Sequence, residues 1–173
     1  MISNMVSIIV ACDKDWGIGK NGSMPWRFPA DFAYFKSKTL GHPMITGRKN
    51  FQDMGVLPGR TTIVLTRDTT WKLSQEHVFV SYDIHDAIER AKWKKGGEEV
   101  FIVGGAEIYE SALKAGAVQT IYLTHITRKS YDCDRFFPYQ YLERFSETNR
   151  TVRYPDEKNT ERLEFITYVK KTP

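Results

Sequence analysis

The sequence IGKNGSMPWRFPADFAYF, residues 18–35, is the stretch on which the interpretation of this chain depends. A glycine-rich segment leads into a Met-Pro-Trp triplet at residues 24–26, and a second proline then opens a predicted helix. Asp31 falls in the first turn of that helix, and on a helical wheel it lies beside Phe28 and Phe35 at the edge of the apolar stripe. A carboxylate on an aromatic face is costly unless a cationic or hydrogen-bonding group meets it. This stretch therefore predicts a site that binds a flat, nitrogen-rich ring.

The sequence on either side of this stretch predicts an α/β fold. Apolar or β-branched runs favour strands at about residues 6–12, 43–46, 61–66, 78–81, 99–103, 119–126, 143–152 and 162–170. Helices are expected at about residues 29–40, 47–55, 83–95 and 105–114. Because helices alternate with apolar strands, we expect a mostly parallel sheet, and the last two strands favour an antiparallel edge hairpin.

Length and composition indicate one globular domain over residues 1–173. Hydrophobic residues make up 41% and charged residues 27% of the chain, and no apolar run approaches the ~18 residues of a membrane span. The first residues lack a basic segment, so we interpret them as leading into a strand and not as a signal peptide. Cys12 and Cys133 are expected to be free thiols in the cytoplasm, and the histidines show no zinc-binding spacing.

The chain carries a net charge of +4, which fits either an ordinary solvated surface or the attraction of an anionic partner. Nucleic acid is not favoured, because the Lys and Arg residues are scattered and no aromatic-basic binding motif appears. Small polyanions, such as a phosphorylated cofactor and a carboxylated substrate, fit the charge at least as well.

Asp31 has a simpler explanation than a binding site, since an acidic residue in a first helical turn complements the helix dipole. The order of the features around it favours a site: a glycine-rich segment, Met-Pro-Trp, a proline, Asp and then Phe. This run resembles dihydrofolate reductase. The resemblance implies that Asp31 is the catalytic carboxylate, which accepts hydrogen bonds from the ring N–H and the 2-amino group of a pterin. It also implies that Met24 and Trp26 belong to a lid that excludes water.

A second motif, Gly104-Gly105-Ala106, joins a predicted strand to a predicted helix. Glycines there allow backbone N–H groups at a helix N-terminus to approach a phosphate, or they serve only the steric needs of a tight turn. The motif is not the GxGxxG fingerprint of dinucleotide-binding folds. Followed by Glu107-Ile108-Tyr109, it resembles the Gly-Gly turn of the same family, where a cis peptide lies beside the nicotinamide and the pyrophosphate.

A third motif, Gly47-Arg48-Lys49-Asn50, places a basic pair between a strand and a helix. The pair suits a phosphate group, or it is simply solvated. The resemblance implies that the motif holds the 2′-phosphate and pyrophosphate of NADPH, with Arg67 contacting the same 2′-phosphate. The residues that the resemblance assigns to the cofactor are Ala11, Ile18, Gly19, Met24, Gly47, Arg48, Lys49, Asn50, Leu65, Thr66, Arg67, Val103, Gly104, Gly105, Ala106, Glu107, Ile108 and Tyr109.

On the substrate side, Arg60 follows a Pro-Gly turn and is explained as a surface charge or, by the resemblance, as the partner of the α-carboxylate of the substrate's glutamate tail. Thr124 is a good strand former, and the resemblance places its hydroxyl against the catalytic carboxylate. His125, on the opposite face of the strand, is interpreted as structural. The implied catalytic residues are Asp31, Trp26 and Thr124, and the implied substrate residues are Ile9, Ala11, Asp31, Phe32, Phe35, Leu57, Arg60, Val103, Tyr109 and Thr124.

Residues 132–138 resemble the loop that braces the lid, and Asp134 matches the residue that hydrogen-bonds the lid backbone; a polar turn is the alternative. The chain departs from the family pattern at three places. Asn50 stands where Thr or Ser is more common, although an Asn can still donate to the pyrophosphate. The segment 55–58 is one residue shorter than the family pattern and lacks an Arg of that pattern. In residues 132–138, Cys133 and Arg135 stand where the family has small residues.

The resemblance covers residues 6–170 and implies a three-layer α/β sandwich. Its central, mostly parallel sheet would have about eight strands, helices on both faces and a ligand cleft at the carboxyl ends of the strands. Residues 42–97 would bind the adenosine part of the cofactor within the single domain.

The implied activity is the NADPH-dependent reduction of 7,8-dihydrofolate to 5,6,7,8-tetrahydrofolate, for thymidylate and purine synthesis. The enzyme would be a cytoplasmic monomer that needs no metal, and antifolates would bind it. Two alternatives stay open. A pyrimidine reductase of riboflavin synthesis shares the general fold and NADPH but lacks the Met-Pro-Trp lid, and a binding or structural protein can keep the pocket without turnover.

Overall fold

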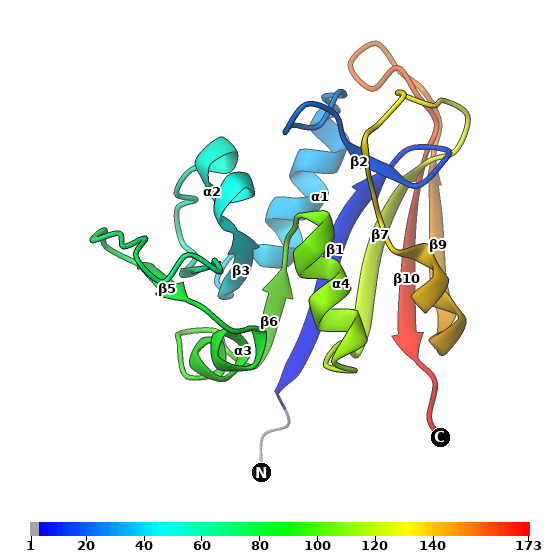
Figure 1. Ribbon diagram of the computed structural model, residues 1–173. Coiled ribbons are helices and arrows are strands. Elements are labelled where there is room, and N and C mark those ends of the chain that lie inside the picture. The colour runs from blue at the N-terminus through cyan, green and yellow to red at the C-terminus, as the bar shows by residue number, and fades with distance from the viewer. Residues whose placement is uncertain (1–3) are drawn as a thin grey trace.

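The computed structural model describes residues 4–173, and its centre is an eight-stranded sheet with the order β5-β4-β3-β6-β1-β7-β10-β9 (Figure 1). Every pairing is parallel except those that β10 makes with β7 and β9. The mostly parallel sheet with an antiparallel C-terminal hairpin is therefore confirmed. The strands are β1 (Met5–Cys12), β3 (Met44–Gly47), β4 (Thr62–Leu65), β5 (Val78–Ser81), β6 (Glu99–Ile102), β7 (Thr120–Ile126), β9 (Phe145–Arg153) and β10 (Leu163–Lys170).

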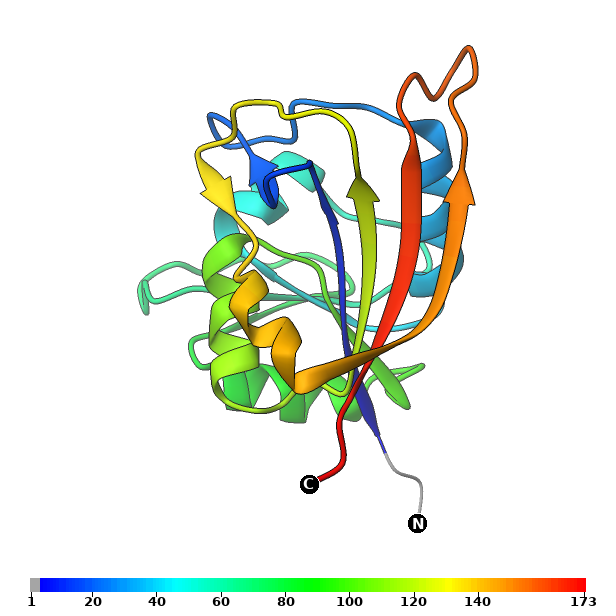
Figure 2. The same cartoon turned by 90° about the vertical axis from the view of Figure 1, so that its right-hand side faces the viewer.

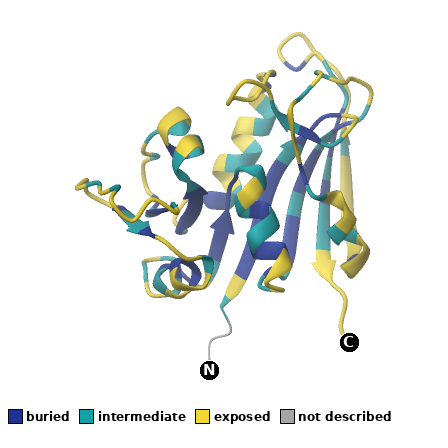
Figure 3. Cartoon of the chain, viewed as in Figure 1, coloured by how far each residue is buried: buried dark blue, intermediate teal, exposed yellow. Residues whose placement is uncertain are grey.

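β1 lies in the middle of the sheet because it is apolar on both faces. Successive side chains of a strand point to opposite faces, so Ile8 and Val10 enter one core while Ile9 enters another. Figure 3 shows the result: β1, β6 and β7 are largely buried, whereas the outer faces of the helices and the long loops are exposed. A strand covered on both sides is typical of parallel sheets.

Helices cover both faces of this sheet, as expected. α3 (Ile84–Lys92) and α4 (Ala106–Lys114) pack on the face that Ile8 shares, and α1 (Pro29–Thr39) packs on the face of Ile9. Figure 2 shows α1 on one side of the strands and α3 and α4 on the other. The short helix α2 (Arg48–Met54) follows β3 directly. The three-layer arrangement is thus confirmed.

Four local features differ from the expectation. The loop after β1 contains a short strand, β2 (Gly17–Gly19), which pairs with β8 (Arg135–Phe136). A 3₁₀ helix, η1 (Tyr139–Arg144), delays the start of β9, and α3 ends at Lys92 instead of near residue 95. The two short strands depend on a partner more than a hundred residues away, so no local periodicity announces them. After α3 the chain runs through turns to Gly96, whose φ of +79° and close approach to the Gly41 carbonyl require a glycine.

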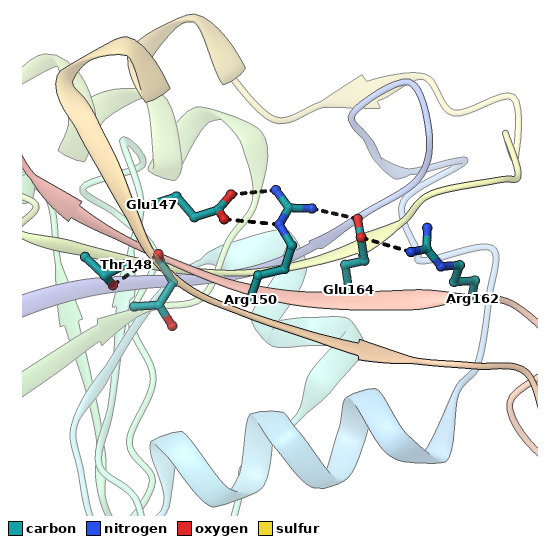
Figure 4. Close-up of polar contacts among 6 residues, drawn as sticks. Glu147, Thr148, Arg150, Arg162 and Glu164 are labelled. Atoms are coloured by element: carbon teal, nitrogen blue, oxygen red, sulfur yellow. Dashed lines mark hydrogen bonds and ion pairs between the residues drawn. The ribbon is translucent and has the colours of Figure 1, made fainter.

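The outer hairpin of β9 and β10 carries an ionic network (Figure 4). The Arg150 guanidinium bridges Glu147, at 2.5 Å, and Glu164, at 2.8 Å. Arg162 lies 3.3 Å from the other oxygen of Glu164. Beside this network the Thr148 hydroxyl donates to the backbone carbonyl of Thr167. The network joins charges on both strands of an edge hairpin, where cross-strand pairs of opposite charge are stabilising.

Within residues 4–173, none of the helices has the length and apolar character needed to cross a membrane. The same residues form no cluster of His, Cys, Asp and Glu suited to a metal ion.

Candidate active site

The expected site residues converge where the parallel strands end. β1 and β7 lie side by side in parallel register, with Ala11 paired to Thr124. The start of α1 is held next to them by a buried cluster that joins Trp26 and Phe28 to the ends of β7 and β10. Because α1 begins at Pro29, whose fixed φ suits a first helical turn, Asp31 is placed directly over this junction.

Asp31 faces an apolar environment without a cationic partner. Part of its surface stays open, yet protein surrounds the carboxyl group closely enough that burial raises its pKa to about 6. A hydrogen bond with Thr124 opposes part of this shift. Among residues 4–173 no Lys, Arg or His pairs with the carboxylate. The carboxylate oxygens of Asp31 can therefore accept further hydrogen bonds from a ligand or from solvent.

An apolar wall stands beside Asp31. Ile9, within β1, and Val103, directly after β6, are buried. Phe35 and Leu57 pack against them from α1 and from the segment before β4. These four expected substrate residues therefore meet in one cluster. Phe32 does not join it: 41% of its surface is exposed, and its ring lies 5.5 Å from the Arg27 guanidinium carbon.

Arg60 is a buried cation whose known hydrogen bonds go to neutral oxygens of the described chain. Only 8% of its surface is exposed, and desolvation lowers its pKa. Its Nε donates to the Pro58 carbonyl at 3.0 Å and its Nη1 donates to the Thr39 hydroxyl at 3.2 Å. These bonds fix the guanidinium plane while the rest of its donors stay available. No acidic side chain of residues 4–173 lies within ion-pair distance of it.

The two residues expected in the lid differ in burial. Met24 is 42% exposed, whereas Trp26 is 7% exposed and packs 5.1 Å from the Tyr131 ring. The Trp26 indole nitrogen is buried and donates to no group of the described chain. Trp26 is therefore an anchor of the segment and a fixed donor at the site, and Met24 alone has the exposure of a cover.

The Gly104-Gly105 peptide is cis, as the resemblance implied. Gly104 has a φ of +122°, and a side chain there would crowd the Tyr109 hydroxyl at 3.3 Å. A Cβ at Gly105 would meet no atom within 4 Å, so the space in front of α4 is open. Tyr109 itself is buried, and its hydroxyl donates to the Ile9 carbonyl at 2.8 Å. The pocket floor is thus braced, while the approach to the first turn of α4 is free for a phosphate.

Asn50 behaves differently from the expectation. Its amide nitrogen donates to the Thr46 hydroxyl at 2.8 Å and to the Val103 carbonyl at 3.3 Å. The Thr46 hydroxyl donates onward to the Gly104 carbonyl, so the orientation of the amide is determined by this chain of bonds. Both amide donors of Asn50 therefore brace the ends of β3 and β6. Only its carbonyl oxygen remains free, and that oxygen cannot donate to a pyrophosphate.

Basic residues gather at the ends of β3 and β4. Arg48 and Lys49 begin α2, while Thr66 and Arg67 follow β4, which pairs in parallel with β3. Their side chains are at least partly open to solvent. This is the arrangement of cations and hydroxyls that suits a phosphate group. The remaining expected cofactor residues line the same strand ends and loops: Ala11, Ile18, Gly19, Gly47, Leu65, Ala106, Glu107 and Ile108.

Two residues that support the site were missed by the sequence analysis. Asp13 is buried, and its carboxylate accepts backbone N–H bonds from Gly17 at 2.8 Å and from Tyr131 at 2.8 Å. It thereby ties the loop after β1 to the loop after β7. Asp134 adds a second tie, because its carboxylate accepts the N–H of Asn21 at 3.1 Å, as expected for a brace.

The second missed residue is Asn159, in the loop between β9 and β10. α1 has no capping side chain of its own, but the Asn159 side-chain oxygen accepts the N–H of Ala30 at 2.9 Å. Asp156 holds Asn159 in place through bonds to its backbone and its amide. The only local signal is an Asp and an Asn in one loop. The partner lies 129 residues away, so local sequence could not reveal this cap.

Comparison with known proteins agrees with this geometry. A family model described as dihydrofolate reductase matches residues 5–170. A dihydrofolate reductase of Staphylococcus haemolyticus is 40% identical over 156 residues, which is 89% of either chain. A type 3 dihydrofolate reductase of Salmonella typhimurium is 34% identical and covers 94% of this chain and 96% of its own.

A solved structure extends the agreement to three dimensions. Dihydrofolate reductase from Enterococcus faecalis, complexed with NADP(H) and RAB-propyl, matches 97% of both chains with a TM-score of 0.86 and 30% identity. The strand order, the similarity in three dimensions and the similarity in sequence all point to one conclusion. The chain belongs to the dihydrofolate reductase family.

Proposed function

We infer that this chain reduces 7,8-dihydrofolate to 5,6,7,8-tetrahydrofolate with NADPH. Its membership of the dihydrofolate reductase family supports this activity. The observation that carries it is Asp31, a carboxylate that has no cationic partner in the described chain and lies one helical turn from Phe35 of an apolar cluster. Such a group matches the polar edge of a pterin, which offers a ring N–H and an amino group side by side.

The residues around Asp31 divide the work on the substrate. Asp31 accepts hydrogen bonds from the ring N–H and the 2-amino group, and its charge favours protonation of the bound pterin at N5. Thr124 and the buried Trp26 indole N–H orient polar groups beside the ring. The cluster of Ile9, Phe35 and its neighbours excludes water from the ring face.

Arg60 serves the other end of the substrate. We propose that its guanidinium binds the α-carboxylate of the glutamate tail, because an arginine fork meets a carboxylate through two parallel bonds. The bonds to Pro58 and Thr39 hold the fork in position before the substrate arrives. Because these bonds already order the Arg60 side chain, they lower the entropic cost of binding the substrate.

The cofactor, when bound, supplies a hydride to C6 of the pterin. The residues present fit it, since open space lies before Gly105 and cations lie at the ends of β3 and β4. We propose that Arg48, Lys49, Thr66 and Arg67 hold the 2′-phosphate. The substitution Arg48→Ala tests this: we expect it to weaken NADPH far more than NADH in a binding titration. Equal loss for both cofactors would remove the assignment.

The activity itself is tested by following NADPH absorbance on addition of dihydrofolate. Turnover that disappears in Asp31→Asn is expected. No consumption of NADPH would contradict the proposal and favour a binding role, whereas consumption only with a pyrimidine substrate would favour the reductase of riboflavin synthesis.

We also propose that the chain acts as a cytoplasmic monomer with one domain over residues 1–173, in which residues 42–97 bind the adenosine part of the cofactor. The unpaired thiols of Cys12 and Cys133 support a location in the cytoplasm. Arg48 and Arg67 lie within residues 42–97 and support the binding role of that portion. Antifolates bind at the same site as the pterin.

A further inference from the structure

Arg48 is already engaged by the protein itself. Its Nη1 lies 3.3 Å from Oδ2 of Asp68, and its guanidinium carbon lies 4.9 Å from the centre of the Trp71 ring. Both partners belong to the segment that follows β4. The cation that is assigned to the 2′-phosphate under the proposed function is therefore already paired with a carboxylate of the chain itself.

The Asp68 carboxylate is held in this position. Its Oδ1 accepts the backbone N–H of Thr70 at 3.0 Å and the Thr70 hydroxyl at 2.5 Å, which leaves Oδ2 for Arg48. Its own N–H donates to the Thr66 hydroxyl at 3.1 Å. The hydrogen bonds from Thr70, more than the Arg48 charge, keep the pKa of Asp68 below its usual value. The carboxylate is therefore negative at any pH at which an enzyme of this kind works.

The chemistry of the two cofactors differs at this point. A 2′-phosphate carries negative charge and must share Arg48 with Asp68 or displace it, so the carboxylate repels this group. A 2′-hydroxyl, as in NADH, is neutral and can donate a hydrogen bond to a carboxylate, which is how acidic residues select NADH in other folds. We propose that Asp68 is a specificity-determining residue that opposes 2′-phosphate binding at Arg48 and so narrows the preference for NADPH over NADH.

The expected change in cofactor affinity depends on how far Arg48 and Asp68 are exposed to solvent. The side chains of Arg48 and Asp68 keep 38% and 46% of their surface, so solvent screens the pair. Exposed pairs contribute little, and we expect removal of the carboxylate to change affinity by about threefold to tenfold. The inference rests on the proposed function, because it assigns the 2′-phosphate to Arg48.

The test is calorimetric titration of NADPH and of NADH into the wild-type chain and into Asp68→Asn. Asn keeps an oxygen for Thr70 and removes only the charge. We expect Asp68→Asn to tighten NADPH by about threefold to tenfold and to leave NADH unchanged or slightly weaker. Glu89→Gln is the matched control, since it removes one negative charge from the exposed surface of α3. We expect it to leave the binding of both cofactors unchanged.

If Asp68→Asn tightens both cofactors equally, or leaves NADPH unchanged, the inference is overturned. In an Arg48→Ala background the gain from Asp68→Asn must shrink, because the two residues act on one phosphate; an undiminished gain also overturns it. If Arg48→Ala alone fails to weaken NADPH selectively, the proposed cofactor site itself is wrong.

Discussion

Two carboxylates of this chain differ in whether a cation compensates their burial. Glu164, on β10, is buried and accepts Arg150 at 2.8 Å and Arg162 at 3.3 Å (Figure 4). Asp31, on α1, has only the Thr124 side chain for a polar partner, and its pKa is raised to about 6. A carboxylate that serves the fold is compensated within the fold, whereas one that serves a ligand is left uncompensated.

The largest expected effect is on turnover. Asp31→Asn keeps the shape of the side chain but removes its negative charge and its ability to take up a proton. We expect kcat near neutral pH to fall by on the order of 10²-fold or more, because general acid–base groups contribute that much. NADPH affinity, measured by titration, stays close to wild type, since Asp31 lies on the substrate side. Turnover close to wild type would refute the role of Asp31.

Glu164→Gln tests whether the paired carboxylate stabilises the fold. The substitution leaves Arg150 and Arg162 without their shared partner, so we expect a loss on the order of 2–3 kcal/mol in the free energy of unfolding, measured in urea. Glu147→Gln is the matched control: Glu147 is more exposed, and its removal costs less than about 1 kcal/mol. kcat is expected to be unchanged by both. A loss of turnover at unchanged stability would show that Glu164 also belongs to the site.

The pH dependence of stability sharpens the contrast. Asp31 has a pKa of about 6 in the folded chain against an ordinary value of 3.8, so the folded state binds more protons between these values. Its favourable contribution is present below about pH 3.8 and is lost as the pH rises through about 6. We therefore expect Asp31→Asn to be more stable than wild type at pH 7, by about 3 kcal/mol, with the difference falling below about 1 kcal/mol near pH 4. Urea unfolding at both pH values measures it, and a less stable variant at pH 7 would contradict the raised pKa.

The smallest expected effect concerns the cap of α1. Asn159→Ala removes the acceptor for the Ala30 N–H, and we expect a loss of about 1 kcal/mol in the free energy of unfolding. Thr160→Ala, at an exposed neighbour in the same loop, provides the control. Equal stability of the two variants would show that the cap contributes nothing.

Much of this molecule could be predicted from local sequence. The apolar run in β1 predicted a strand buried on both faces, and the prolines and glycines around residues 29–43 marked the helix that carries Asp31. Helices alternating with strands predicted the parallel sheet. β2 and β8 were missed because two- and three-residue strands have no periodicity of their own.

The residues of the site could be predicted from the sequence, but the hydrogen-bond partners and the burial of individual side chains could not. Asn50 was expected to donate outward, yet its donors are used by Thr46 and Val103. Trp26 was expected in a lid, yet it is buried in the cluster that anchors α1. Asp68 had no predicted role, since its importance arises only from its distance to Arg48.

The sequence by itself determined the order of elements, the apolar faces and the identity of the groups that can do chemistry. These properties follow from side-chain type and from spacing along the chain, which are local. Only the tertiary structure decided which of these groups are compensated. Whether Asp31 or Glu164 meets a cation, and whether Asn159 caps a helix that begins 130 positions earlier, depends on neighbours that the folded sheet brings together. Electrostatic energies depend on distance in space and not on distance along the chain, and for that reason the fold had to be seen before the roles could be assigned.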